Sequence, residues 1–593
     1  MNKKYLTKRY FIAQFRRSIN NENKILASKL FPGTRELLSD YIQMHNDVVE
    51  NIENDKFKKA RLDLINGMEF FLKESILYNH DLYKYEIATL ISNINLVNKK
   101  SKDNDKEILG YIKINNMCTS FLKKLNKDNI YEYIIHNVKC SNNFDEVDKL
   151  VNEFISELLY DGYSLKYLLE WFKQEIKNVN SDNIDNLIDK FITLKQNKEK
   201  FTYYISLNND CGKERYIDLN VKLKKVYEEE LKSIDVASQD NISKFIIQGN
   251  ALNIYKVEVE SMDIYRGLET IKRSFNSYFQ IINSLLEHRN SILLNNKCIV
   301  RLNDNTYKKL RIESYDEDTL FSSMENREKQ EIEDFIKYRD TVYETMENID
   351  EISNIQRAIN IVKSQKEQSQ ENRLINLWSV LEYILTFNDG GSIISNVKEV
   401  IPKVVCLYSI KDKINIFWHQ LYKYKDANID IVNRFISECT RENDEYQYDL
   451  NNLVNFIEQE GKSLISHFEF NSILQRGISE IGYLLYSKEG RDKYIKKLYK
   501  QTECDLSRIY RTRNILIHSS KRELFNIDYK SLRLHKYNSH ILAIIIYYKT
   551  KNPHLTITEI LSSIEHTYNE YISKIGTEDI DKLQICKPRY LFI

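Results

Sequence analysis

The chain has few of the residues that interrupt regular structure: 4 prolines and 14 glycines among 593 residues. These two residue types mark turns, hairpins and the loops that cradle phosphate groups. Their scarcity favours long helices over a fold of many short strands. The glycine-rich patterns GxxxxGK[ST] and GxGxxG do not occur, which removes the simplest nucleotide-hydrolase functions.

Clusters of metal-binding or disulfide-forming residues are also missing. The 8 cysteines contain no CxxC pair, and no two histidines have the HxxxH spacing. The basic N-terminus lacks the apolar stretch of a secretory signal, and the longest apolar run, residues 541–548, is too short to span a bilayer. We therefore expect a cytoplasmic protein with no membrane segment, no metal and no cofactor.

No excess of charge of one sign is present either, since 87 Lys and Arg nearly balance 86 Asp and Glu. A surface for a polyanion must therefore be a local patch.

The length exceeds what one hydrophobic core usually organises, so two or three domains are expected.

What the chain does have is helical periodicity. From about residue 37 to residue 191 the apolar residues recur at helical spacing, and Gly162 followed by Ser164 predicts the stop and the new N-cap of a helical hairpin. Aromatic and β-branched residues then predict strands at 201–207, 251–259 and 297–302, with a helix at 265–287.

Helical patterns return in the C-terminal part, at 373 onward and at 393–424, 432–460, 473–486, 491–518 and 532–549. The predicted fold is mainly α. Its predicted parts are a helical N-terminal region (1–199), a small α/β module (200–362), a C-terminal helical bundle (363–550) and a C-terminal helical extension (551–593).

One predicted helix, residues 504–520, carries an arginine on its apolar side. On a helical wheel Leu506, Ile509, Tyr510, Leu516 and Ile517 form an apolar stripe, and Arg513 falls in its middle. Arg511, Asn514 and His518 lie together beside the stripe. A guanidinium at a core-facing position needs an anionic partner, or it extends its methylenes over the stripe to reach water. A lone histidine at a helix end is ordinarily a cap or a surface residue.

The surrounding segment, residues 491–536, is basic: it holds 13 Lys and Arg against 5 Asp and Glu. Such a segment would attract a phosphate backbone, and its tyrosines could stack on bases. The alternative is an ordinary solvated helix face. The residues predicted to contact RNA are Arg508, Tyr510, Lys521 and Arg522.

Two segments resemble a known family. Residues 510–518, which contain Arg513-Asn514 and His518, resemble the RNxxxH signature of the HEPN superfamily. Residues 373–382, with Trp378 and Glu382 at matching places, look like the opening helix of its Apea-like branch. The resemblance covers roughly residues 365–550, and more loosely the regions before. Glu382 lies at the edge of its helix's apolar stripe and is the candidate partner of Arg513, unless it is an ordinary boundary glutamate.

The resemblance implies a C-terminal HEPN bundle and a metal-independent endoribonuclease. In that family Arg and His act on the phosphodiester, commonly where two HEPN domains meet, which implies RNA as substrate and a homodimer or higher homo-oligomer. His518 would be the acid or base, Arg513 would stabilise the charge, and Asn514 would orient the ribose, phosphate or partner histidine. Arg511 is expected from the wheel to contact the RNA backbone.

The resemblance also implies a toxin or antiphage-defence effector set off by a phage-derived or cellular trigger, with the N-terminal 360 residues as sensor or brake. Family members regulated by AMPylation carry a tyrosine two residues after the histidine, whereas Ser519-Ser520 follow His518, so such regulation is not expected. The alternatives are a non-catalytic HEPN module that binds RNA or a protein partner, and a helical scaffold without a nucleic-acid role.

Overall fold

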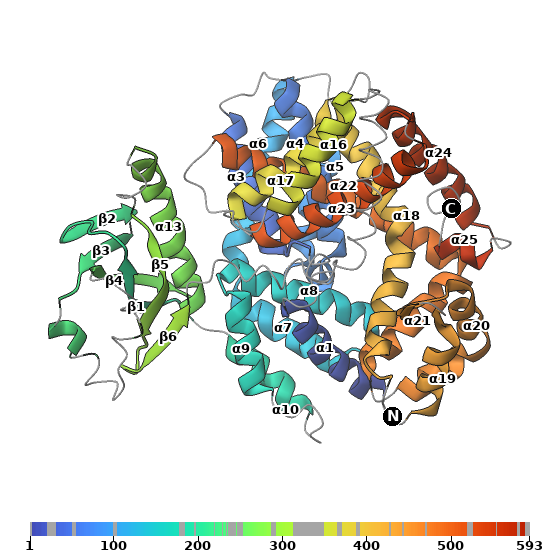
Figure 1. Cartoon of the computed structure of the whole chain (residues 1–593), viewed down its shortest axis with the longest axis horizontal. Coiled ribbons are helices and arrows are strands. Elements are labelled where there is room, and N and C mark those ends of the chain that lie inside the picture. The colour runs from blue at the N-terminus through green and yellow to red at the C-terminus, as the bar shows by residue number, and fades with distance from the viewer. Residues whose placement is uncertain are drawn as a thin grey trace.

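A computed structural model provides the structure of the chain. It describes residues 3–20, 31–49, 55–98, 104–176, 184–194, 197–218, 220–227, 229–232, 234, 245, 253–285, 292–311, 349–364, 370–386, 392–425, 429–441, 444–468, 471–518, 526–552, 554–577 and 581–586. The described residues form a large helical body with a small sheet-containing module on one side of it (Figure 1). The prediction of a mainly α fold with a small α/β module is confirmed.

The N-terminal region is helical, as the periodicity predicts. Its α-helices are α1 (Lys3–Ile19), α3 (Thr34–Val49), α4 (Asp55–Glu74), α5 (Lys84–Asn98), α6 (Asn104–Lys124), α7 (Lys127–Cys140), α8 (Phe144–Asp161), α9 (Leu165–Glu175) and α10 (Ile184–Asp189), with short 3₁₀ turns at Ile76–Asn79 and Lys190–Leu194. The predicted hairpin joins α8 and α9. Gly162 ends α8 at φ 102°, and the Ser164 hydroxyl accepts a hydrogen bond from the Tyr167 amide at 3.2 Å.

The α/β module is a six-stranded antiparallel sheet in the order β2-β3-β4-β1-β5-β6. Its strands are β1 (Glu199–Leu207), β2 (Glu214–Asp218), β3 (Val221–Lys225), β4 (Asn253–Ser261), β5 (Leu294–Arg301) and β6 (Tyr307–Arg311), and α13 (Ile264–Leu285) covers one face. Central β1 pairs with both β4 and β5, so that Thr202 lies opposite Glu258 and Arg301. The sequence predicts these three apolar strands, whereas the short β2, β3 and β6 are rich in charged residues and carry little hydrophobic signal.

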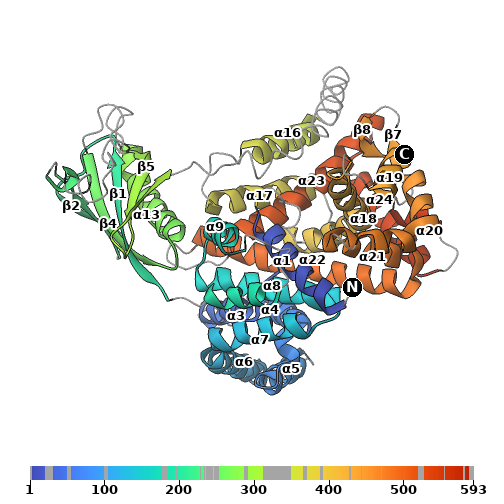
Figure 2. The ribbon, with the colours of Figure 1, turned by 90° about the horizontal axis from the view of Figure 1, so that it is seen from below.

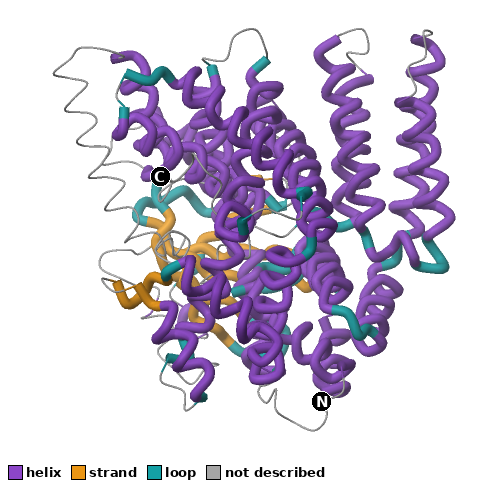
Figure 3. The backbone as a smooth tube through the Cα atoms, turned by 90° about the vertical axis from the view of Figure 1, so that its right-hand side faces the viewer, coloured by secondary structure: helices purple, strands orange, loops and turns teal. Residues whose placement is uncertain are grey.

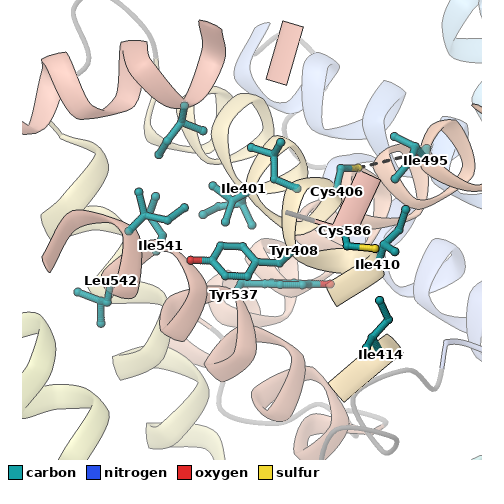
Figure 4. Close-up of a cluster of buried hydrophobic side chains, with 14 of the residues drawn as sticks. Ile401, Cys406, Tyr408, Ile410, Ile414, Ile495, Tyr537, Ile541, Leu542 and Cys586 are labelled. Atoms are coloured by element: carbon teal, nitrogen blue, oxygen red, sulfur yellow. Dashed lines mark hydrogen bonds between the residues drawn. The ribbon is translucent and has the colours of Figure 1, made fainter. Parts of the chain in front are cut away.

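The C-terminal bundle is built around one extended hydrophobic core. Its helices are α16 (Ile349–Lys363), α17 (Gln370–Leu385), α18 (Ile393–Tyr422), α19 (Asp430–Cys439), α20 (Leu450–His467), α21 (Ser472–Tyr486), α22 (Lys488–His518), α23 (Ile527–Lys551), α24 (Ile557–Ile575) and α25 (Lys582–Cys586). Figure 4 shows how side chains from four of them meet: Ile401 to Ile414 from α18, Ile495 from α22, Tyr537 to Leu542 from α23 and Cys586 from α25. None of the described helices is both long and apolar enough to cross a membrane.

The hydrophobic core of this bundle extends beyond its predicted limits, 363 and 550. Ile352 and Ile355 of α16 are buried in the same core, and so are Ile560 of α24 and Cys586 of α25. The single helix predicted at 432–460 is wrong: the polar segment after α19 forms a hairpin of β7 (Thr440–Arg441) and β8 (Asp444–Tyr448) before α20 begins.

The N-terminal helices pack directly against this bundle. Helix α4 contacts α22, and α1 contacts α21, so helices of the N-terminal region and of the C-terminal bundle lie side by side in Figures 1 and 2. Tyr529 of α23 is buried in the N-terminal core. Figure 3, coloured by secondary structure, shows that helices make up most of the described chain.

A buried ion pair attaches α16 to the bundle and can test whether this helix is part of it. Lys549 of α23 is fully buried and donates to Glu351 of α16, whose other oxygen accepts from the Ile557 amide at 3.0 Å. Removing one partner of a buried pair costs about 3–5 kcal/mol, because the other charge stays buried. We expect Lys549→Met to lower the thermal midpoint by several degrees, measured by circular dichroism. Exposed Lys551→Met on the same helix should leave the midpoint unchanged, and equal midpoints for the two variants would contradict the assignment.

Candidate active site at the end of helix α22

Helix α22 is buried on two sides. Leu506 and Ile509 lie in the core of the C-terminal bundle, whereas Cys504 packs with Phe71 of α4 and Leu37 of α3. The helix becomes more exposed toward its C-terminal end, where Ile517 is 43% exposed. Ile517 therefore lies outside the apolar stripe that the wheel predicts for it, and the helix emerges from the protein at the segment resembling the HEPN signature.

Arg513 and Glu382 form an ion pair between α22 and α17. Arg513 Nη2 lies 3.2 Å from Glu382 Oε1 and 3.5 Å from Oε2, and Arg513 Nη1 donates to Asn514 Oδ1 at 3.1 Å. The predicted pairing of Arg513 with Glu382 is confirmed. The side chains are 20% and 26% exposed, so the pair is partly buried but reachable from solvent.

Aromatic residues hold the pair in place. Fully buried Trp378 donates from Nε1 to Glu382 Oε1 at 3.1 Å, which fixes the carboxylate that faces Arg513. The Tyr510 ring lies 5.1 Å from the Trp378 ring, between centroids, and packs on the core. Tyr510 thus packs between the core and the ion pair's neighbour Trp378. The sequence predicts a different role, in which an exposed ring stacks on bases.

The histidine of the motif is the last residue of α22. The His518 side chain, Lys521 and Arg522 lie outside the described residues, so their predicted roles stay predictions. The backbone is helical through residue 518, and five steps of 100° place positions 513 and 518 about 140° apart around the axis. The two positions therefore face different sides of the helix.

Arg508 does not have the surface position predicted for an RNA contact. Only 2% exposed, it donates from Nη2 to Glu36 Oε1 and to Asp40 Oδ2, each at 2.6 Å. Both carboxylates belong to α3 of the N-terminal region. Burial alone would raise the pKa of Asp40, but the charges of Arg508 and Lys530 hold this pKa below its usual value. The prediction for Arg508 is wrong in this arrangement, because its guanidinium is already bonded to the N-terminal region.

The basic segment as a whole is largely neutralised. Lys497 pairs with Glu74 at 2.6 Å, Lys536 pairs with Asp412 at 2.7 Å, and buried Arg491 donates to backbone carbonyls. These cations therefore form neither the predicted phosphate-attracting patch nor an ordinary solvated helix face. A charge count along the sequence overlooks this, because several of the acidic partners lie hundreds of residues away.

A further buried polar group, not predicted from the sequence, lies one turn before Arg508. Asp505 is fully buried and accepts from Arg533 Nε and Nη2, each at 2.7 Å, and from the Tyr537 hydroxyl at 3.0 Å. A signal was present: Asp505, Arg508, Thr512 and Ile515 recur at steps of three and four, which indicates a second buried face. Arg511 lies near α3 as well, since its charge helps to lower the pKa of Asp40.

Breaking the bonds of Arg508 should destabilise the whole helical body. We expect Arg508→Met to leave Glu36 and Asp40 buried without their main cation, at a cost of about 3–5 kcal/mol, and to lower the thermal midpoint at pH 7 by several degrees. The folded-state pKa of Asp40 is lowered, so the contribution of this carboxylate is present above about pH 4 and is lost as pH falls below it. The difference between wild type and variant should therefore shrink in acid.

Lys496→Met is the matched control. Lys496 lies on the same helix but is 70% exposed and pairs only with Asp492 four residues away, a contact worth about 0.5 kcal/mol. Its midpoint should stay close to that of the wild type. A loss in Arg508→Met no larger than in Lys496→Met would show that the contact of α22 with α3 is dispensable.

Comparison with known proteins adds no family. No protein-family model matches the chain, and neither the curated proteins nor the solved structures gave a match. Among the described residues, no group of three or more His, Cys, Asp or Glu side chains is arranged to hold a metal ion. The resemblance to HEPN proteins therefore rests on residues 373–382 and 510–518, and what it implies about function is a proposal.

Proposed function

We propose that the chain is a metal-independent endoribonuclease of the HEPN type. The observation that carries the proposal is the ion pair between Arg513 and Glu382, which are 131 residues apart in the sequence. Each lies in one of the two segments that resemble the family. An accidental likeness of two short segments would give no reason for them to meet in space.

Arg513 has the geometry to bind a phosphoryl group. Nη2 donates to both oxygens of Glu382, whereas Nη1 carries two hydrogens and gives one to Asn514. The second hydrogen of Nη1 remains for an oxygen of a phosphodiester, with the side chain partly exposed. Bound in this way, the guanidinium would stabilise the negative charge that builds up on the phosphoryl oxygens.

His518 would move the protons of the reaction. As base, an imidazole takes the proton of the ribose 2′-OH while the 2′ oxygen bonds to the neighbouring phosphorus. The bond from phosphorus to the 5′ oxygen breaks, and that oxygen receives a proton from an imidazolium acting as acid. The products are a 2′,3′-cyclic phosphate and a 5′-hydroxyl, and an ordinary histidine pKa of about 6.5 suits both steps near neutral pH.

A second copy of the chain would complete this site. Because positions 513 and 518 lie about 140° apart on α22, we infer that one copy supplies Arg513 and the other His518 at each phosphate. The active form would then be a homodimer acting on RNA in the cytoplasm. The contact of α3 with Arg508, five residues before Arg513, supports a role for the N-terminal region as a brake on a toxin or antiphage-defence effector that a phage-derived or cellular trigger releases.

The chemistry can be tested with the full chain, in cells and in vitro. Under an activating challenge, we expect the wild type to degrade RNA and slow growth, and the purified protein to cut RNA in EDTA with 2′,3′-cyclic phosphate ends. His518→Ala and Arg513→Ala should each lower the cleavage rate by about 100-fold or more, because each removes a group that acts in the transition state.

His467→Ala is the matched control, since His467 is exposed and is also the last residue of its helix, α20. It should cleave like the wild type. A wild-type protein that shifts RNA on a gel but leaves it intact, with the same affinity in Arg513→Ala, would instead identify a non-catalytic HEPN module.

Glu382 should act by positioning Arg513. Glu382→Gln keeps the shape and one acceptor oxygen but removes the negative charge, so Arg513 would be oriented less firmly. We expect cleavage to fall by about tenfold with an unchanged thermal midpoint, because exposed and half-exposed ion pairs contribute only about 0–1 kcal/mol to stability. Glu371→Gln, on the first turn of the same helix, is the control and should keep full activity. Full activity in Glu382→Gln would rule out the positioning role.

A further inference from the structure

A cavity of about 200 Å³ lies where the N-terminal region meets the C-terminal bundle. Helices α1 and α8 form one wall, and α18 and α21 form the other. Any molecule bound there would therefore touch both regions at once. The cavity is separate from the candidate active site, whose residues do not line it.

Charged side chains line both walls, and most of them are paired. Asp148 of α8 accepts from the Tyr10 hydroxyl at 2.6 Å and from Arg476 Nη2 at 3.3 Å across the interface. Lys413 of α18 donates to Glu480 of α21. Burial raises the pKa of Asp148 despite the charge of Arg476.

Arg17 is the exception. It lines the cavity from α1, and its Nε and Nη2 atoms are buried without a hydrogen-bond partner among the described residues. Burial lowers its pKa to about 10, even though Tyr10 and Asp148 oppose that effect. On the facing wall Arg476 Nε is also buried and unpaired, and Gln14 Oε1 is an unpaired acceptor on α1. A buried guanidinium without a partner is costly unless a ligand supplies the acceptor.

We propose that this cavity binds a small molecule that carries an oxyanion, either a phosphate or a carboxylate. The free N–H groups of Arg17 and Arg476 come from opposite walls and would donate to the anionic oxygens. Three cationic side chains line the cavity against two acidic ones, which leaves one positive charge for the ligand to balance.

The remaining lining defines the rest of the ligand. Since about 10–15 Å³ of such space holds one water molecule, a cavity of about 200 Å³ has more room than one oxyanion needs. Val151, Ile416 and Phe417 supply apolar surface, and Gln14 can accept a hydrogen bond from a hydroxyl group. The ligand is thus a small hydroxylated acid or sugar phosphate, and its binding holds the N-terminal region against the bundle.

The test uses the full chain and three probes: inorganic phosphate, ribose 5-phosphate and citrate. Each is titrated at constant ionic strength, with chloride as the reference salt, while the thermal midpoint is measured and binding is followed by calorimetry. We expect at least one probe to raise the midpoint with saturation and to bind one per chain. Stronger binding of ribose 5-phosphate or of citrate identifies the phosphate or the carboxylate as the anion.

The variant Arg17→Met removes the unpaired guanidinium. It should weaken binding of the active probe at least tenfold, whereas Arg16→Met, the exposed neighbour on the same helix, should bind like the wild type. Without ligand, the midpoint of Arg17→Met should equal or exceed that of the wild type. Three results would each overturn the proposal: saturation with none of the probes, equal binding by Arg17→Met, or a lower ligand-free midpoint in Arg17→Met, which would show that the guanidinium already has partners. None of these readouts depends on ribonuclease activity.

Discussion

The rest of the structure depends on the buried contact of Arg508 with Glu36 and Asp40. Charges removed from water are tolerated only when groups of opposite charge and hydrogen-bond partners are placed to pair with them. This cluster therefore permits one register of α22 against α3. Apolar packing between the same helices would tolerate small shifts. The ion cluster therefore determines where the N-terminal region lies, and it does so on the helix that also carries Arg513.

A second polar contact holds the same two regions together, at Arg476 and Asp148 beside the cavity. Two polar contacts at separate places on one interface make small adjustments costly, because sliding the regions would leave charges unpaired at both. The interface is thus suited to two arrangements, closed or separated, rather than to a continuum. Under that condition, binding at the cavity would influence α22 without any contact to the residues of the candidate active site.

Local rules explain what could be predicted from sequence. The helical hairpin follows from two local features: the left-handed backbone of Gly162, which ends α8, and the hydroxyl of Ser164, which caps α9. The pairing of Arg513 follows from the need of a partly buried guanidinium for a carboxylate. The place of α16 in the core and the role of Arg508 could not be predicted in this way. Both depend on partners brought in from distant parts of the chain, and no spacing within a helix contains that information.

Two arginines of α22 that look alike in the sequence differ in their exposure to solvent. Arg508 and Arg513 are five residues apart, and both fall on or beside buried stripes. Arg508 is 2% exposed and bonded to two carboxylates, whereas the Arg513 side chain is 20% exposed and bonded to one. A guanidinium enclosed by two carboxylates has little capacity for a phosphate and serves the fold. A guanidinium that one carboxylate orients at the emerging end of the helix keeps donors free, and there the same residue type can serve a reaction.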